Sequence, residues 1–128
     1  MSNAKILVVE DSIVARKVAV ITFEKLGCIV NSVEDGFSAL NIVEHNMYDL
    51  ILMDIGLPDI SGIEVTKKIR ATENNEHRIF IVALTANFSE NEKHILIDAG
   101  LDDLLIKPLT PVMAKDMLNK YTGHKFNE

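Results

Sequence analysis

The sequence predicts an α/β domain built on a doubly wound parallel sheet of five strands, and two observations carry this prediction. Five short apolar runs alternate with five segments of helical periodicity along the 128 residues. Four of the runs are dense in Ile, Val and Leu and lack polar alternation, as parallel strands do when helices cover both faces. Strands that alternate with helices favour right-handed crossovers, and we expect the strand order 2-1-3-4-5.

The expected strands are short and spread along the whole chain. Their sequences are KILVV (5–9), CIVNSV (28–33), LILM (50–53), IFIVAL (79–84) and LLI (104–106). CIVNSV alternates apolar and polar residues more than the other runs do. It therefore suits a strand near an edge of the sheet, where one face is less completely covered.

The first two helical segments show apolar residues at helical spacing. Val14, Val18 and Ile21 recur at steps of four and three, so we expect this face to pack on the core. Ser12 is a suitable N-cap for this helix. The apolar positions of the second segment are Phe37, Leu40 and Val43.

The last three helical segments carry recognisable boundaries. The third covers about residues 63–71. The fourth begins near Ser89, which is followed three residues later by a glutamate as in a capping box, and it closes at Gly100. The fifth begins at Thr110, a cap that Pro111 follows in the first helical position.

Composition limits the possible functions. The net charge of −6 means that the chain lacks the basic surface that direct nucleic-acid binding needs. No apolar run approaches the length of a membrane span and no signal peptide is evident, so we expect a cytoplasmic protein that does not bind membranes. Cys28 is expected to be a small buried residue in a reducing compartment. We expect one domain over residues 4–121, and a C-terminal tail or the start of a linker over 122–128.

Polar side chains follow four of the expected strands at the point where each strand ends. Glu10 and Asp11 follow the first strand, and Asp54 follows the third. Thr85 follows the fourth strand and Lys107 the fifth. The carboxyl ends of parallel strands meet at one edge of an open sheet, where ligands bind, so we expect these five side chains in one crevice.

This combination of side chains predicts phosphoryl transfer. Three carboxylates in one crevice repel one another, and Mg²⁺ resolves the repulsion because it prefers carboxylates, waters and a carbonyl. Lys107 and Thr85 suit an incoming phosphoryl group through charge and a hydrogen bond, and Asp54 would be the nucleophile that forms an aspartyl phosphate. Each residue alone also fits an ordinary strand end, turn, cap or surface lysine. A functional site is favoured because all of these residues are expected at the same edge of the sheet.

Four motifs occur together at these strand ends: ILVVEDS (6–12), LILMDIGLPDISG (50–62), IVALTA (81–86) and AGLDDLLIKP (99–108). With these motifs, the chain resembles the receiver domain of two-component response regulators over about residues 4–121. The resemblance implies a flavodoxin-like (βα)5 fold, like that of a chemotaxis regulator, in a stand-alone protein or a hybrid sensor kinase. It also implies Mg²⁺ as cofactor and a histidine kinase or histidine phosphotransfer protein as partner.

The resemblance implies a role for each acidic residue and for the threonine. Asp54 matches the phosphoacceptor. Asp11 matches a direct Mg²⁺ ligand, Glu10 a residue that reaches the metal mainly through water, and the carbonyl of Gly56 the third protein ligand. Thr85 matches the switch hydroxyl that turns toward the phosphoryl group.

Residues of the remaining loops complete the implied site. Lys107 matches the lysine that pairs with the phosphoryl group, and the Lys107–Pro108 bond is expected to be cis. Gly62 matches a residue that shapes the loop after the phosphoacceptor. At the position where the family often has an aromatic switch residue, this chain has Leu104, so we expect any structural switch to depend on Thr85 and the following loop.

Two interpretations of function remain open from the sequence. In the first, the domain accepts a phosphoryl group from phosphohistidine and switches partner binding through the face around the fourth helix, fifth strand and fifth helix. It would catalyse its own phosphorylation and dephosphorylation without being a conventional enzyme. In the second, it is an interaction module that works without phosphorylation, although the usual sign of this, loss of a site residue, is not seen. A dinucleotide site is a poor fit, because the loop after the first strand is acidic.

Overall fold

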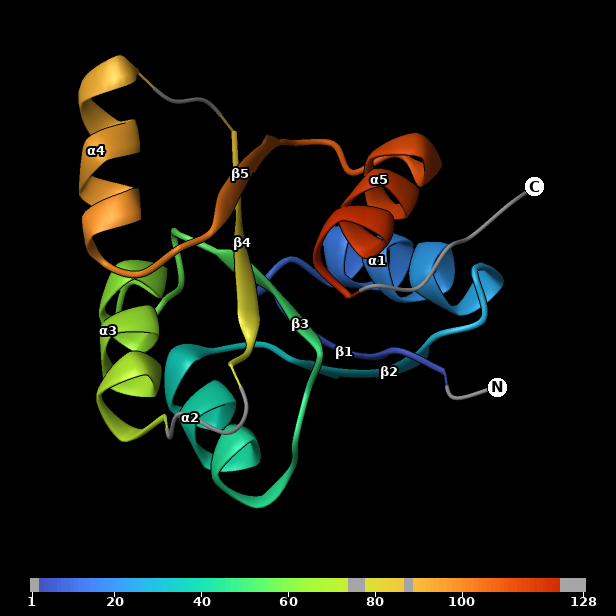
Figure 1. Cartoon of the computed structure of the whole chain (residues 1–128), viewed down its shortest axis with the longest axis horizontal. Helices are drawn as coiled ribbons and strands as arrows, with labels where there is room; N and C mark the ends of the chain where they lie inside the picture. The colour runs from blue at the N-terminus through green and yellow to red at the C-terminus, as the bar shows by residue number, and fades with distance from the viewer. Residues whose placement is uncertain (1–2, 74–77, 87–88, 123–128) are drawn as a thin grey trace.

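Strands and helices alternate five times in the computed structural model, which describes residues 3–73, 78–86 and 89–122 (Figure 1). The strands are β1 (Lys5–Val9), β2 (Ile29–Val33), β3 (Leu50–Asp54), β4 (Phe80–Thr85) and β5 (Asp103–Ile106). The helices are α1 (Ile13–Lys25), α2 (Gly36–His45), α3 (Gly62–Thr72), α4 (Glu90–Asp98) and α5 (Pro111–Tyr121). None of the helices in this part of the chain is both long enough and apolar enough to cross a bilayer.

The five strands form one parallel sheet in the predicted order, β2-β1-β3-β4-β5, with β2 at an edge. From β1, the chain adds β2 on one side and then β3, β4 and β5 on the other, so the strand order reverses between β1 and β3. In this type of fold, a crevice forms at that point. We predicted that Asp54 and Thr85 follow their strands, but each is the last residue of its strand. Asp54 pairs with Leu84, and Thr85 with Ile106, because the ladder continues one residue beyond each apolar run.

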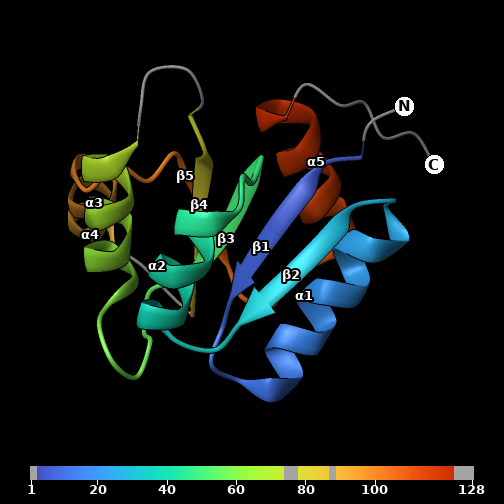
Figure 2. The ribbon, with the colours of Figure 1, turned by 90° about the horizontal axis from the view of Figure 1, so that it is seen from below.

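The sheet separates two layers of helices. α1 and α5 cover one face, and α2, α3 and α4 cover the other (Figures 1 and 2). Successive strand residues point to opposite faces, so Ile6 and Val8 pack beneath α1 and α5, whereas Leu7 and Val9 belong to the other core. Residues 50–53 are all fully buried. The central strands are therefore covered on both faces, as their apolar sequences predict.

The apolar face that we predicted for α1 is wrong, because this helix is apolar on more than one side. Its buried side is formed by Ala19 and Phe23, since an aromatic side chain buries more apolar area than a valine does. Val14, Val18 and Ile21 are instead 73%, 45% and 51% exposed. The exposed apolar residues of α1, called the α1 row below, are Ile13, Val14, Val18 and Ile21.

The helix boundaries follow the predicted signals. Ser12, Ser89 and Thr110 each cap a helix by accepting a hydrogen bond from the backbone N–H three residues later. Gly100 follows α4 with a φ of +108°, a left-handed conformation that favours glycine. One predicted apolar position of α2 is wrong: Phe37, in the first turn of the helix, is largely exposed.

Candidate functional site

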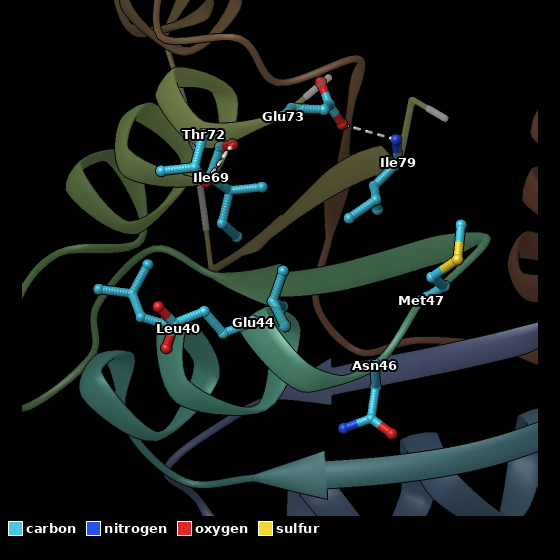
Figure 3. Close-up of a pocket in the computed structure, with 9 residues that line it drawn as sticks. Leu40, Glu44, Asn46, Met47, Ile69, Thr72, Glu73 and Ile79 are labelled. Atoms are coloured by element: carbon cyan, nitrogen blue, oxygen red, sulfur yellow. Dashed lines mark hydrogen bonds between the residues drawn. The ribbon is translucent and has the colours of Figure 1, made fainter. Parts of the chain in front are cut away.

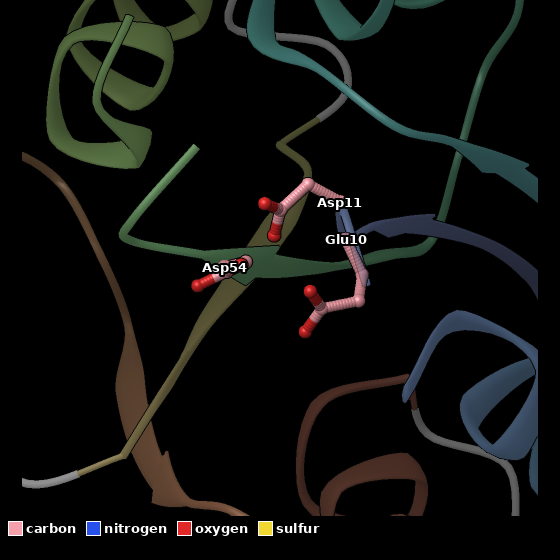
Figure 4. Close-up of side chains that lie close together, drawn as sticks. All are labelled: Glu10, Asp11 and Asp54. Atoms are coloured by element: carbon pink, nitrogen blue, oxygen red, sulfur yellow. The ribbon is translucent and has the colours of Figure 1, made fainter. Parts of the chain in front are cut away.

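Three carboxylates meet at the carboxyl edge of the sheet (Figure 4). Glu10 and Asp11 follow β1, and Asp54 ends the neighbouring strand β3. One carboxylate oxygen from each residue lies within 4.8 Å of the other two. Glu10 is 1% and Asp54 5% exposed, whereas Asp11 is exposed. The structure thus brings together the three acids that the sequence assigns to one crevice.

Glu10 is held by contacts with its backbone and with its side chain. Its N–H extends the sheet by donating to Val33 O at 3.1 Å, and its carbonyl accepts a hydrogen bond from the Arg16 guanidinium at 3.0 Å. The N–H of Ser12 donates to Glu10 Oε2 at 3.0 Å. Glu10 Oε1 lies 2.8 Å from Lys107 Nζ, but the angles do not suit a hydrogen bond. The positive charge of the lysine is therefore what compensates the burial of this oxygen.

Lys107 lies one residue beyond β5 and points into the acidic cluster. Its Nζ is 2.8 Å from Glu10 Oε1 and 3.6 Å from Asp54 Oδ2. Partial burial lowers the pKa of Lys107, but the contact with Glu10 and the charge of Asp54 outweigh this effect and raise the pKa above its ordinary value. The ammonium therefore stays charged at neutral pH. The Lys107–Pro108 bond is cis, as expected.

The carboxyl group of Asp54 holds a proton more tightly than usual. Burial raises the pKa of Asp54 to about 6, and neighbouring Glu10 adds to the rise, whereas the N–H of Gly56 (3.1 Å from Oδ1) and the charge of Lys107 oppose it. Burial also acts to raise the pKa of Asp11, but hydrogen bonding with Asp54 and Glu10 outweighs it and leaves the pKa below its ordinary value. One lysine does not offset three carboxylates, so a divalent cation fits this set of donors.

Thr85 lies beside Lys107 at the end of β4. The N–H of Lys107 donates to Thr85 O at 2.8 Å, which continues the pairing of β4 with β5. Leu104 is half-buried and packs against the core on the face covered by α2, α3 and α4. An aliphatic residue therefore occupies the position at which the family that the sequence resembles often has an aromatic one. Thr85 also lines a cavity of about 190 Å³ together with Ile55, Ile63, Glu92, Ile95 and Leu96.

Two glycines shape the loop after Asp54 in different ways. The N–H of Gly62 donates to Ile55 O at 2.9 Å and closes the base of the loop. A Cβ atom on Gly62 would collide with the carbonyl oxygen of Asp54, so the position requires glycine. Gly56 is exposed, and a Cβ atom there would meet nothing within 4 Å.

Sequence reasoning missed two residues whose hydrogen bonds join separate segments of the chain. Arg16 binds the carbonyl of Glu10 from the second turn of α1. Asp59 accepts hydrogen bonds from the N–H groups of Gly36 and Phe37, each at 2.8 Å. An arginine four residues after the Ser12 cap is a weak signal. Residues four apart lie on the same face of a helix, so the arginine side chain can reach the helix start. The sequence contains no comparable signal for Asp59.

A larger groove of about 320 Å³ lies elsewhere, between α2 and α3 (Figure 3). Glu73, an acidic residue in its wall, already accepts hydrogen bonds from the N–H of Ile79 at 2.7 Å and from Arg70 at 2.9 Å. The lining residues are Leu40, Val43, Glu44, Asn46, Met47, Ile69, Thr72, Glu73 and Ile79. None of the predicted site residues lines this groove, so it is separate from the acidic cluster.

The chain is similar to known proteins in sequence and in structure. The model of the response regulator receiver domain matches residues 6–119. Sensor protein GacS of Pseudomonas syringae pv. syringae is 36% identical over 121 residues, which cover 93% of this chain. The receiver domain of sensor histidine kinase PA1611 from Pseudomonas aeruginosa PAO1, with a magnesium ion coordinated in its active site cleft, has a TM-score of 0.86 and 36% identity, covering 96% of this chain and 100% of that one.

A third similarity involves a complex from Saccharomyces cerevisiae. The co-crystal structure of the histidine phosphotransfer signaling protein Ypd1 with the receiver domain of its downstream response regulator Ssk1 contains a chain with a TM-score of 0.86 and 27% identity. The match covers 94% of this chain and 90% of that one.

The match to the family model includes the whole acidic cluster together with Thr85 and Lys107. The chain spans 13% of the length of GacS, so GacS contains much more than the part that matches. The family match, the strand order and the similar solved structures agree with one another. The chain therefore belongs to the response regulator receiver domains of two-component systems.

Proposed function

We propose that Asp54 accepts a phosphoryl group from phosphohistidine in a Mg²⁺-dependent reaction. The observation that carries this proposal is the meeting of Glu10, Asp11 and Asp54 within 4.8 Å, with Lys107 Nζ only 3.6 Å from Asp54 Oδ2. A nucleophile, a set of metal donors and a cation for the phosphoryl group then occur at one edge of the sheet.

The donor set suits Mg²⁺. Glu10, Asp11 and Asp54, with the carbonyl of Gly56, would hold the ion, Glu10 mainly through water. When bound, Mg²⁺ supplies charge neutralisation for the acidic cluster and for the phosphoryl oxygens. The magnesium ion in the active site cleft of the similar PA1611 receiver domain supports the same cofactor here.

The chain's own residues then position and stabilise the transferred group. A carboxylate oxygen of Asp54 attacks phosphorus, an O–P bond forms and the N–P bond of the donor breaks, and the electron pair returns to the imidazole nitrogen. The Lys107 ammonium, which contacts Asp54 Oδ2, offers its charge to a phosphoryl oxygen, and the Thr85 hydroxyl donates a hydrogen bond. Hydrolysis of the aspartyl phosphate at the same site would return the domain to its initial state, so catalysis is limited to its own modification.

A histidine kinase or a histidine phosphotransfer protein is the proposed donor. Such a partner must bring its phosphohistidine to Asp54, and α1 begins two residues after Asp11. The α1 row gives this rim of the site an exposed apolar surface, of the kind that a partner covers. The complex of Ypd1 with the Ssk1 receiver domain supports a partner of this class.

The proposed output is a change in partner binding at the face around α4, β5 and α5. Thr85 connects the site to this face, because it ends β4 and pairs with Ile106 of β5, the strand that also contains Leu104. A hydroxyl that turns toward the phosphoryl group would alter the neighbouring cavity beneath α4. We place the reaction in the cytoplasm, and the free, buried Cys28 is compatible with a reducing compartment.

Intact mass spectrometry tests the proposal. The protein is incubated with acetyl phosphate and MgCl₂, and one added phosphoryl group is expected, which EDTA prevents. Asp54→Asn should abolish the adduct, whereas Asp98→Asn, at an exposed acid of α4, should leave it unchanged. An adduct that persists in Asp54→Asn, or no adduct on the wild type, contradicts the proposal and favours a module that works without phosphorylation.

A further inference from the structure

The loop between β3 and α3, residues 55–61, is fastened to the start of α2 by the side chain of Asp59. Asp59 Oδ1 accepts a hydrogen bond from the N–H of Gly36 and Oδ2 one from the N–H of Phe37, each at 2.8 Å. Burial acts to raise the pKa of Asp59, but these N–H groups outweigh it and lower the pKa. Both bonds are charge-assisted and lie at a helix N-terminus, where a negative charge is favoured.

The packing beside Asp59 is as close as the hydrogen bonds imply. A Cβ atom on Gly36 would lie 2.5 Å from Ile60 Cγ1 and 2.8 Å from Val65 Cγ2. A residue with a side chain would force Ile60 and Val65, or α2 itself, to shift. Glycine at the first position of α2 therefore lets the helix approach the loop residue next to Asp59.

The loop has a second fastening at its base. The N–H of Gly62 donates to Ile55 O at 2.9 Å, and the N–H of Ile55 donates to Leu84 O of β4 at 3.4 Å. Gly56 lies between the two fastenings and is exposed. Its N–H donates to Asp54 Oδ1 at 3.1 Å, so the position of this loop bears directly on the acidic cluster.

We infer that Asp59 is a positioning residue: by fastening the loop to α2, it holds Gly56 where its N–H orients the Asp54 carboxylate and its carbonyl can reach the bound cation. The inference rests on the proposed function, because it assigns the cation to the same acidic cluster. Asp59 lies three residues beyond Gly56 in the sequence and acts through the backbone of the loop. Residues that orient metal ligands in this indirect way influence metal affinity strongly.

Asp35 provides a matched control. It is also a carboxylate at the start of α2, and its Oδ1 accepts a hydrogen bond from the N–H of Ser38 at 2.8 Å. Removing Asp35 therefore takes a negative charge and a cap from the same helix terminus. It leaves the link between α2 and the loop in place, so it separates capping from positioning.

The test compares the full chain with its Asp59→Ala, Asp59→Asn and Asp35→Ala variants in three measurements. Urea unfolding gives the stability of each, titration calorimetry with MgCl₂ gives the affinity for the ion, and amide hydrogen exchange by NMR reports on Gly56 in the metal-free protein.

Both alanine variants should lose stability. Asp59→Ala should also weaken Mg²⁺ binding about tenfold and speed exchange at Gly56. Asp35→Ala should leave both of these within about twofold of the wild type, and Asp59→Asn, which keeps one acceptor, should lie in between.

Two results would overturn the inference. One is unchanged Mg²⁺ affinity and unchanged exchange at Gly56 in Asp59→Ala. The other is an equal loss in Asp35→Ala, which would show that Asp59 acts only as a cap or through its charge. If the wild type binds no Mg²⁺, the proposed function fails, and exchange at Gly56 in the metal-free variants still decides whether Asp59 positions the loop.

Discussion

The ammonium of Lys107 lies 2.8 Å from Glu10 Oε1, an oxygen that is buried and has no hydrogen bond of suitable geometry. Glu10 follows β1 and Lys107 follows β5, so this contact reaches across the carboxyl edge of the sheet. A buried carboxylate without a compensating charge is costly. The lysine that is proposed to bind the phosphoryl group therefore also stabilises the domain.

Lys107→Met should destabilise the metal-free protein at pH 7. The substitution leaves the Glu10 carboxylate buried without its cation, and we expect a loss of about 1–3 kcal/mol in the free energy of unfolding, measured in urea. Lys67→Met is the control, because Lys67 Nζ lies 3.8 Å from Glu64 Oε1 and both side chains are more than half exposed. That variant should stay within about 0.5 kcal/mol of the wild type. Equal effects of the two substitutions would contradict the role given to the Lys107 contact.

Asp54→Asn should stabilise the metal-free protein at neutral pH. The folded state raises the pKa of Asp54 from 3.8 to about 6, so the folded protein binds this proton more tightly than the unfolded chain does. The contribution of this carboxyl group to the free energy of unfolding is fully present below pH 3.8 and is lost as the pH rises through about 6. Above that pH, the variant should be more stable by about 1–2 kcal/mol, after allowance for solvent screening at the open edge of the site.

The pH profile of unfolding distinguishes this effect from a general one. The advantage of Asp54→Asn should disappear as the pH falls toward 4, where the wild-type carboxyl is protonated in both states. EDTA must be present, because a bound divalent cation would compensate the charge of Asp54. A stability difference that does not depend on pH would show that the proton on Asp54 is not its cause.

Gly62→Ala and Gly56→Ala should differ sharply, although Gly56 lies in the loop between β3 and α3 and Gly62 directly follows this loop as the first residue of α3. A Cβ atom on Gly62 would collide with the carbonyl oxygen of Asp54, whereas one on Gly56 would meet nothing within 4 Å. We expect a loss of about 1–3 kcal/mol in the free energy of unfolding for Gly62→Ala, and a change within about 0.5 kcal/mol for Gly56→Ala. Thermal unfolding followed by circular dichroism measures both. Similar values would mean that the loop relaxes around the added methyl group.

The α1 row should matter for transfer from a protein donor and not for reaction with a small one. Val14 and Ile21 are 73% and 51% exposed, so Val14→Ser with Ile21→Ser should barely change stability. The double variant should take its phosphoryl group about tenfold more slowly from a phosphorylated phosphotransfer protein that reacts with the wild type. Its labelling by acetyl phosphate should be unchanged. Val112→Ser, at a 67% exposed residue of α5, is the control and should not slow the transfer.

The sequence predicts the fold well because each element carries its own signal. The apolar runs give the strands, and caps such as Ser89 and Thr110 give the helix starts. The buried side of α1 could not be predicted, because valines at helical spacing compete with Phe23 for the core and only the packing decides between them. The ends of β3 and β4 were misplaced by one residue, since ladder pairing does not stop where apolarity stops.

The acidic cluster could be predicted because strand ends meet at one edge, which places Glu10, Asp11 and Asp54 together without any knowledge of side-chain geometry. The contact of Lys107 with Glu10 could not, because two strands lie between theirs in the sheet. The link from Asp59 to Gly36 joins a loop to the start of a helix 23 residues earlier in the chain. Each of these contacts depends on tertiary packing, and no local pattern in the sequence records it.

The hydrogen bond from Lys107 N–H to Thr85 O joins the end of β4 to the residue that directly follows β5, and these two residues carry the proposed phosphoryl-binding side chains. Their backbones are therefore joined by a bond of 2.8 Å. An anion that contacts both the Lys107 ammonium and the Thr85 hydroxyl would therefore bridge two backbone segments that this hydrogen bond already holds in register.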